Sequence, residues 1–178
     1  MRLSLLFAAT ISALVTFAAA RSAAEAPAPA AIARAEQEAG ALIADRIDRI
    51  RSDRLPHAPK LAPSGDLTVI ARARSSAMAH GAPFSHKDAT GKYPVVDMVE
   101  ARLGHYGFIG ENLFMEKRPR GRFDPKAFAK LAVEEWMASE EHRENILSPD
   151  FDRSGIGVAV KGDVAYATQV FHGPATRR

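Results

Sequence analysis

The chain has 178 residues, 47% of them hydrophobic and 25% charged, which is typical of a globular protein and excludes a disordered or collagen-like chain. It contains no Cys, which excludes disulfides, thiolate metal sites and Cys nucleophiles. The net charge is +3 with scattered basic residues, so we expect no nucleic-acid partner. The densest basic stretch, 117–122, is expected to be a solvated loop, with contact to a phosphate or lipid headgroup as the alternative.

Residues 1–20 predict a secretory signal peptide. Arg2 precedes an apolar run that ends in three alanines, which is the pattern of a cleaved signal. An uncleaved membrane anchor is the alternative, because the run is nearly long enough to cross a bilayer. Residues 21–33 are rich in Ala and Pro and predict a flexible leader. We therefore expect a secreted protein, periplasmic or extracellular, with no stable membrane span after cleavage.

The folded part is predicted to be one domain, 34–174, followed by a short tail, 175–178. A first amphipathic helix is expected from about 34 to 52, because apolar residues recur there at helical spacing. Three prolines between residues 55 and 63 predict an irregular connection. A second helix, about 65–80, is expected to begin at the N-cap Ser64. Its inward residues are expected to be Leu67, Ile70, Ala71, Ala77 and Met78.

Two further helices are predicted before the C-terminal strands. One covers Pro94 to Leu103 and ends at Gly104. The other begins at Asp124-Pro125, because Asp caps free N–H groups and Pro fits the first helical position, and it continues to about Ser139. Its buried stripe is expected to contain Phe128, Leu131, Ala132 and Trp136, with Glu135 and Ser139 on the same face.

The C-terminal region predicts a β-hairpin with strands 155–161 and 164–171 around the turn Gly162-Asp163. If residue 161 pairs with residue 164, both faces of the hairpin are largely apolar. A hairpin that is apolar on both faces is expected to lie between layers of helices. The sequence therefore predicts an α+β fold, a three-layer α/β/α sandwich.

Six short motifs occur along this domain in a fixed order. Together they resemble the CAP superfamily (cysteine-rich secretory proteins, antigen 5 and pathogenesis-related 1 proteins), in particular its cysteine-free bacterial branch, and the resemblance covers about 35–171. It implies the same α/β/α sandwich. The motifs are Phe84-Ser85-His86, residues 102–107, Gly110-Glu111-Asn112, residues 136–147, residues 155–158 and residues 166–171.

The resemblance implies a surface cleft in which His86 and His142 face each other with Glu111 beside them. Family members often bind a divalent metal such as zinc through this pair of His residues, while the carboxylate holds a tautomer or accepts a proton. The fuller family site has a second Glu where this chain has Ser139. We therefore expect a weakly bound metal on His86 and His142, and a ligand site that also includes Glu111 and Ser139.

Other polar residues in these motifs are expected to be structural. Trp136 is expected to pack in the core, Asn112 and Asn145 to tie loops to the backbone, and Gln169 to donate a structural hydrogen bond. A calcium loop from Asp150 is disfavoured, because its twelfth position is Lys instead of Glu. The sequence also lacks HExxH and GxSxG, which disfavours a zinc protease and a serine hydrolase.

The resulting functional hypothesis is a secreted, monomeric protein that acts as a binding module. The binding role is what the resemblance implies, because the family's reported ligands include sterols and other lipids. The resemblance leaves an unidentified protein as another possible partner. A metal-assisted hydrolase with Glu111 as general base is the first alternative, in which His86 and His142 are the other candidate catalytic residues. A structural or adhesion protein of the cell envelope is the second alternative.

Overall fold

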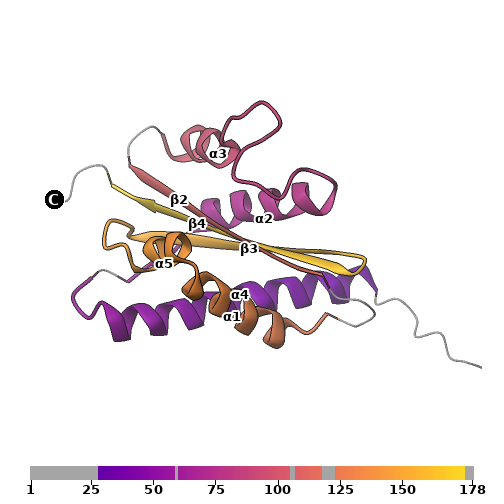
Figure 1. Cartoon of the computed structure of the whole chain (residues 1–178), viewed down its shortest axis with the longest axis horizontal. Helices are drawn as coiled ribbons and strands as arrows, with labels where there is room; N and C mark the ends of the chain where they lie inside the picture. Colours follow the sequence, from indigo (N-terminus) through magenta and orange to yellow (C-terminus); the bar gives the residue numbers. More distant parts are fainter. Residues whose placement is uncertain (1–27, 59, 105–106, 118–122, 175–178) are drawn as a thin grey trace, which may run out of the picture.

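The computed structural model describes residues 28–58, 60–104, 107–117 and 123–174. A four-stranded sheet with the order β1-β3-β4-β2 lies between two layers of helices (Figure 1). This arrangement confirms the predicted α+β fold and three-layer sandwich. The predicted signal peptide, the leader up to residue 27, most of the basic stretch and the C-terminal tail lie outside the described residues. No helix of the described ranges is long and apolar enough to cross a membrane.

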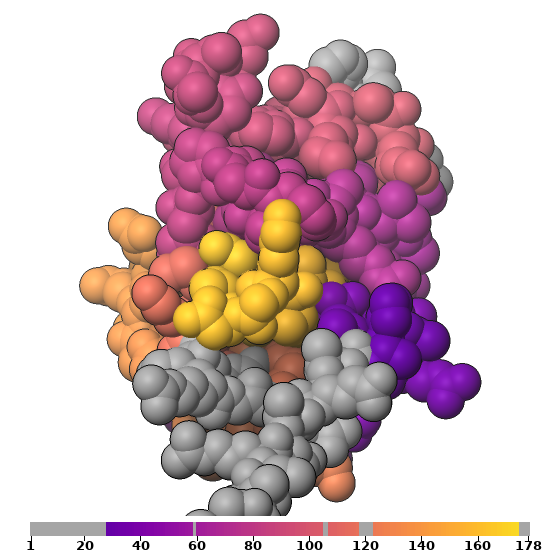
Figure 2. Space-filling model, turned by 90° about the vertical axis from the view of Figure 1, so that its right-hand side faces the viewer, coloured from indigo at the N-terminus to yellow at the C-terminus, as the bar shows by residue number. Residues whose placement is uncertain are grey.

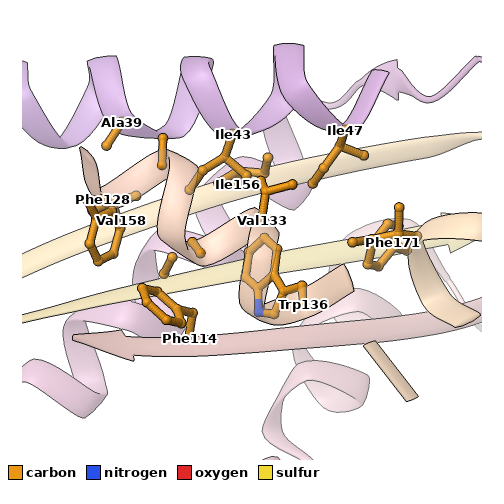
Figure 3. Packing of buried hydrophobic residues seen from close by; sticks show 14 of the residues in the cluster. Ala39, Ile43, Ile47, Phe114, Phe128, Val133, Trp136, Ile156, Val158 and Phe171 are labelled. Carbon is orange, nitrogen blue, oxygen red and sulfur yellow. The ribbon is translucent and has the colours of Figure 1, made fainter. Parts of the chain in front are cut away.

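One face of the sheet is covered by α1 (Pro29–Arg54) and α4 (Pro125–Ala138). The predicted cap of α4 is confirmed, because the Asp124 carboxylate accepts from the N–H groups of Lys126 and Ala127. α1 begins at Pro29, five residues earlier than expected and inside the segment predicted as a leader, because Pro fits the first turn of a helix. Its apolar residues meet those of α4 and the sheet in one core, drawn in Figure 3: Ala39, Ile43, Ile47, Phe128, Val133, Trp136, Ile156, Val158 and Phe171.

The predicted buried stripe of α4 was wrong at two positions. Leu131 is 36% exposed and Glu135 is exposed, whereas Ala129 and Val133 are buried. The helix is therefore rotated so that Phe128, Ala132 and Trp136 remain inward while the i+3 and i+7 positions from Phe128 face solvent. Similarly, Ala77 in the second helix is exposed instead of inward.

The opposite face is covered by α2 (Gly65–Ala79) and α3 (Pro94–Leu103). The predicted N-cap of α2 is confirmed, because the Ser64 hydroxyl accepts from the Leu67 N–H. α2 lies very close to the sheet at two glycines: a Cβ at Gly155 or at Gly157 would lie 2.1 Å from a backbone nitrogen of α2. No side chain separates the helix from the strand at these positions.

The predicted hairpin is present as β3 (Arg153–Lys161) and β4 (Val164–Gly173), and Lys161 pairs with Val164 as expected. Gly162 in the turn has a φ of 62°, in the left-handed region that favours glycine. Ile156 and Val158 join the core under α1, whereas Val170 packs under α2. Both faces of the hairpin are therefore covered, as predicted.

Three elements were not predicted. β2 (Phe108–Lys117) pairs antiparallel with β4 along its whole length, although Glu111 and Asn112 interrupt its apolar pattern. α5 (Glu140–Leu147) was missed because Ile146 is its only buried residue. β1 (Ala62–Pro63) lies in the stretch expected to be irregular, and its Pro is tolerated because the strand forms a sheet edge.

Candidate functional site

β2 is an edge strand of the sheet, and two of its consecutive residues face opposite layers. Glu111 pairs in register with Val170 and faces the α2 side, where its carboxylate contacts Arg74 and His86. Asn112 faces the α5 side, where its amide donates to the backbone carbonyl of His142. Gly110-Glu111-Asn112 thus holds one histidine from each side of the sheet at the same edge.

The Glu111 side chain is only 2% exposed and lies between two partners. Arg74 Nε donates to Oε1 at 2.8 Å, and Arg74 Nη2 lies 3.5 Å from Oε2. His86 Nδ1 is 2.8 Å from Oε2. A buried carboxylate requires such partners, because an unpaired charge in the interior is costly.

His86 follows α2 in a short irregular segment that Arg74 fixes in place. Arg74 Nη2 donates to the backbone carbonyl of Ser85 at 2.8 Å, next to His86 in the chain. Because Nδ1 of His86 is directed at the Glu111 carboxylate, which only accepts, Nδ1 is the donor of this hydrogen bond and Nε2 is the ring nitrogen left for another partner. The side chain is 42% exposed, so this nitrogen is accessible from outside.

His142 lies on α5 and faces His86 across the cleft. The two ring centroids are 6.3 Å apart, at an interplanar angle of 54°. Burial, and secondly the nearby His86, lowers the pKa of His142 below its ordinary value. The imidazole is therefore kept neutral at neutral pH, which is the form that binds a metal ion.

Two asparagines fix the position of α5 relative to β2, so their predicted structural role is confirmed, although they join a helix to a strand and not loops to the backbone. Asn145 donates to the side-chain oxygen of Asn112 at 2.9 Å and lies 3.4 Å from the Glu111 carbonyl. A Cβ at Gly110 would lie 3.1 Å from the Asn145 side-chain oxygen, so glycine leaves room for this contact. Trp136 is 1% exposed, which confirms that it is a core residue, and its indole N–H donates to the Leu113 carbonyl.

Ser139 lies between α4 and α5 and is the last residue before the helix that carries His142. Its backbone carbonyl accepts from the Arg143 N–H, and its hydroxyl does not cap α5. Ser139 as a ligand-binding residue stays a prediction. The structure thus brings His86, Glu111 and His142 together, while Ser139 immediately precedes the helix that carries His142.

A cavity of about 350 Å³ adjoins His86. His86, Glu111 and Asn145 line its polar side, and Tyr93, Val95 and Ile109 belong to its more apolar side. Tyr93 is 47% exposed, and the Lys87 ammonium lies 5.1 Å from its ring centroid. The cavity therefore combines the His86 imidazole with an aromatic and aliphatic wall, and His142 lies across from that imidazole.

Sequence reasoning missed Arg74 and Tyr93. Arg74 did have a signal, because it falls four residues after Ile70 and seven after Leu67 on the buried face of α2. A charged residue on an apolar stripe needs a buried partner. Tyr93 had no comparable signal, because an exposed aromatic residue beside a proline is common in loops.

The donor set fits a weakly held metal ion. Within the described residues, no group of three or more His, Asp, Glu or Cys side chains could hold a metal. Glu111 is close but is engaged by Arg74 and His86. Among the described residues, the two imidazoles are therefore the donors that a metal ion at this place would use, with water in its remaining positions.

Comparison with known proteins identifies relatives of this fold. The family model described as "CAP: Cysteine-rich secretory protein family" matches residues 44–171. The protein YkwD of Bacillus subtilis (strain 168) is 34% identical over 98 residues, which is 55% of this chain. The match covers only 34% of YkwD, so this chain corresponds to about a third of that relative.

Two solved structures are similar over most of the chain. An extracellular SCP-domain protein from Bacillus anthracis str. Ames is 26% identical with a TM-score of 0.64, covering 83% of this chain and 44% of that one. An outer surface protein of Borrelia burgdorferi has a TM-score of 0.64 at 14% identity, covering 78% and 94% of the two chains. The second likeness concerns the fold alone.

Proposed function

The chain belongs to the CAP family, the cysteine-rich secretory protein family, and on this premise we propose that it is an exported binding module. Its cleft holds a divalent metal ion, such as zinc, between His86 and His142. The same cleft accepts a lipid or another small ligand against the wall that contains Tyr93 and Val95. The observation that carries the proposal is the pair of facing imidazoles, one of them oriented by a buried carboxylate.

The spacing of the two rings supports a shared metal ion. A zinc ion about 2.0–2.1 Å from one nitrogen of each ring lies roughly 3 Å from each ring centroid. Two rings on one zinc ion are therefore separated by about 5–6 Å, close to the 6.3 Å between His86 and His142. Glu111 supports the site indirectly, because it fixes the His86 tautomer that presents Nε2.

The affinity is expected to be modest. Structural zinc sites use four protein ligands and catalytic ones three, whereas this cleft offers two. We expect a Kd for zinc of about 1–100 μM, corresponding to roughly 5.5–8.2 kcal/mol of binding free energy. Such a metal exchanges with the surroundings and leaves coordination positions open for water or for a ligand.

Zinc titration by calorimetry tests the metal site. The wild-type protein is expected to bind one equivalent of zinc, and His86→Ala and His142→Ala are each expected to abolish the binding. His57→Ala is the matched control, because His57 is exposed and lies in the loop after α1. Absence of binding in the wild type, or binding that both cleft variants retain, would contradict the proposed metal site.

The contacts of Glu111 favour a binding module over the hydrolase alternative. Both carboxylate oxygens are engaged, one by Arg74 and the other chiefly by His86. A general base needs a proton-accepting oxygen that faces its substrate or a bound water. A zinc-dependent hydrolysis of ester or peptide substrates that Glu111→Gln abolishes would overturn this choice. The envelope-protein alternative would gain if His86→Ala with His142→Ala left all ligand binding intact.

Export is the second component of the proposal. Residues 1–20 have the pattern of a cleaved signal peptide, and the similar structure from Bacillus anthracis is that of an extracellular protein. We expect the exported protein to begin at Arg21 and to be monomeric. N-terminal sequencing of the protein from the periplasm and from the medium, with its mass in solution, tests these expectations.

A further inference from the structure

A second cavity, of about 360 Å³, lies away from the two cleft histidines. It runs along the outer edge of β3, between α1 and α2, and we refer to it as the β3-edge groove. Its lining includes Glu36, Gly40 and Asp48 from α1, Arg72 from α2, and Ile156 and Val158 from β3. Figure 2 shows the end of the molecule where the β3–β4 hairpin (yellow) is flanked by α1 (indigo) and by the segment around the end of α2 (magenta).

The backbone of β3 has unpaired positions along this groove. Lys161 and Val164 flank a two-residue turn, so these two residues exchange backbone hydrogen bonds. Because hydrogen-bonded and non-hydrogen-bonded pairs alternate along an antiparallel ladder, the even-numbered residues of β3 direct their backbone N–H and C=O groups away from β4. At one end of this outer edge, the Ser154 carbonyl accepts from the Ser64 N–H. At the other end, the Val160 N–H donates to the Glu36 carboxylate at 2.8 Å.

Ile156 and Val158 lie between these two occupied positions. The described part of the chain supplies no partner on the groove side for their N–H and C=O groups. Both residues are nevertheless largely buried, with exposed fractions of 9% and 4%. Their side chains are held in the core, so the unpaired backbone groups stay fixed along the groove, and an unpaired strand edge is a template for an added strand that supplies donors and acceptors.

Gln169 on β4 is a second, independent sign of a ligand. It pairs with Ile156 in register, lines the groove and is 0% exposed. Both its side-chain oxygen and its side-chain nitrogen lack a hydrogen-bond partner within the described residues. The structure therefore corrects the prediction that Gln169 donates a structural hydrogen bond. A buried carboxamide is complementary to another amide, which can donate and accept at the same time.

Gly40 keeps space beside the unpaired strand. Glycine in the interior of a helix is less stable than alanine, yet it occurs in the middle of α1 at the position that faces β3. A Cβ at this position would meet only the Ile156 carbonyl oxygen at 3.7 Å and an Ile156 methyl group at 3.8 Å. A larger side chain would extend from α1 into the groove.

The charges on the two walls differ in sign. Glu36 and Asp48 lie on the α1 wall, whereas Arg72 lies on the α2 wall and is exposed. Alternate side chains of an extended strand point in opposite directions. A peptide paired with Ile156 and Val158 would therefore direct one set of side chains to the acidic wall and the other set to Arg72.

We propose that the β3-edge groove binds a short extended peptide, which adds a strand to β3 and alternates basic side chains toward α1 with acidic ones toward Arg72. Main-chain hydrogen bonds to Ile156 and Val158 supply affinity, and the two charged walls select the side chains. The site is separate from the metal cleft, so it does not depend on the function proposed for His86 and His142.

The probe is the capped peptide Ac-Lys-Glu-Lys-Glu-Lys-NH2, titrated into the protein and followed by amide NMR and hydrogen exchange. We expect the amide signals of Ile156 and Val158 to shift, with a Kd of about 1 mM or tighter, and their exchange to slow by at least about tenfold at saturation. The same peptide N-methylated at every residue keeps only the N–H groups of its C-terminal amide, so it cannot pair as a strand and should not bind. Shifts confined to other residues, or equal binding of the methylated peptide, would overturn the proposal.

Two variants locate the site independently of the peptide design. Gly40→Leu places a side chain in the groove, and Arg72→Glu reverses the charge on the α2 wall. Each variant should weaken peptide binding at least about tenfold. Ala33→Leu is the matched control for Gly40→Leu, since Ala33 is exposed on α1 and does not line the groove. Unchanged peptide binding by Gly40→Leu would contradict the proposal. So would a dimer of the wild type that Gly40→Leu dissociates, because the occupant would then be a second copy of the chain.

Discussion

Arg74→Met tests whether a buried ion pair supports the cleft. The side chains of Arg74 and Glu111 are 6% and 2% exposed, so the substitution leaves a carboxylate in the interior with His86 as its remaining partner. Removing one member of a buried pair costs about 3–5 kcal/mol. The hydrogen bond from Arg74 to the Ser85 carbonyl is lost as well. For a domain of this size the melting temperature should fall by roughly 6–20 °C, at about 2–4 °C per kcal/mol.

Urea unfolding followed by circular dichroism measures this cost. Arg72→Met is the matched control, because Arg72 is an exposed arginine of the same helix, and it should change the free energy of unfolding by less than about 0.5 kcal/mol. Arg74→Met combined with Glu111→Gln should recover at least about 1 kcal/mol, since the neutral amide removes the unpaired charge. The reasoning is refuted if Arg74→Met costs no more than Arg72→Met, or if the two substitutions are additive in the double variant.

Three further predictions concern the stability of the fold. Burial, and secondly Arg153, lowers the pKa of His172, so the unfolded chain binds its proton more readily. The contribution of His172 to the free energy of unfolding should therefore be fully present above the unfolded pKa of about 6.5 and should decline as the pH falls below it. In His172→Gln, the urea midpoint should fall less steeply with decreasing pH than in the wild type. An equally steep fall in both proteins would contradict this prediction. Gly157→Ala should lower the free energy of unfolding by about 1–3 kcal/mol or more, because the added Cβ would lie 2.1 Å from the Arg72 backbone nitrogen. Gly65→Ala, whose Cβ would meet no atom within 4 Å, should lower it by less in the same urea assay. Trp136→Phe should lower the free energy of unfolding by about 1–3 kcal/mol, since the Leu113 carbonyl loses its buried donor. A decrease below about 0.5 kcal/mol, the size expected for a surface substitution, would contradict this prediction.

The elements that the sequence predicted have strong local signals. Ser64 and Asp124 cap their helices with their side chains, and the turn at Gly162 fixes the pairing of Lys161 with Val164. These features act within a few residues, so the sequence shows them directly. The family motifs placed His86, Glu111 and His142 in one cleft, which no spacing rule alone could predict for residues so far apart.

The missed elements depend on tertiary contacts. β2 is a buried strand despite Glu111 and Asn112, because α2 and α5 supply the partners of these two side chains. α5 buries only Ile146, and its position depends on the hydrogen bonds of Asn145 and of the His142 carbonyl to Asn112. A pattern of polar residues in one segment cannot show that another segment compensates for their burial.

Two buried carboxamides lie side by side in the sheet, and they differ in whether the fold supplies their hydrogen-bond partners. This difference distinguishes the β2 edge from the β3 edge of the sheet. Asn112 on β2 pairs in register with Gln169 on β4, and both are 0% exposed. Asn112 donates to the His142 carbonyl and accepts from Asn145, so its burial is compensated within the fold. Gln169 has no such partners in the described ranges, although desolvation costs both amides similarly. A Leu at this position would fill similar volume without that cost, so a ligand of the proposed β3-edge groove is what would compensate for the Gln169 amide, whereas Asn112 serves to assemble the histidine cleft.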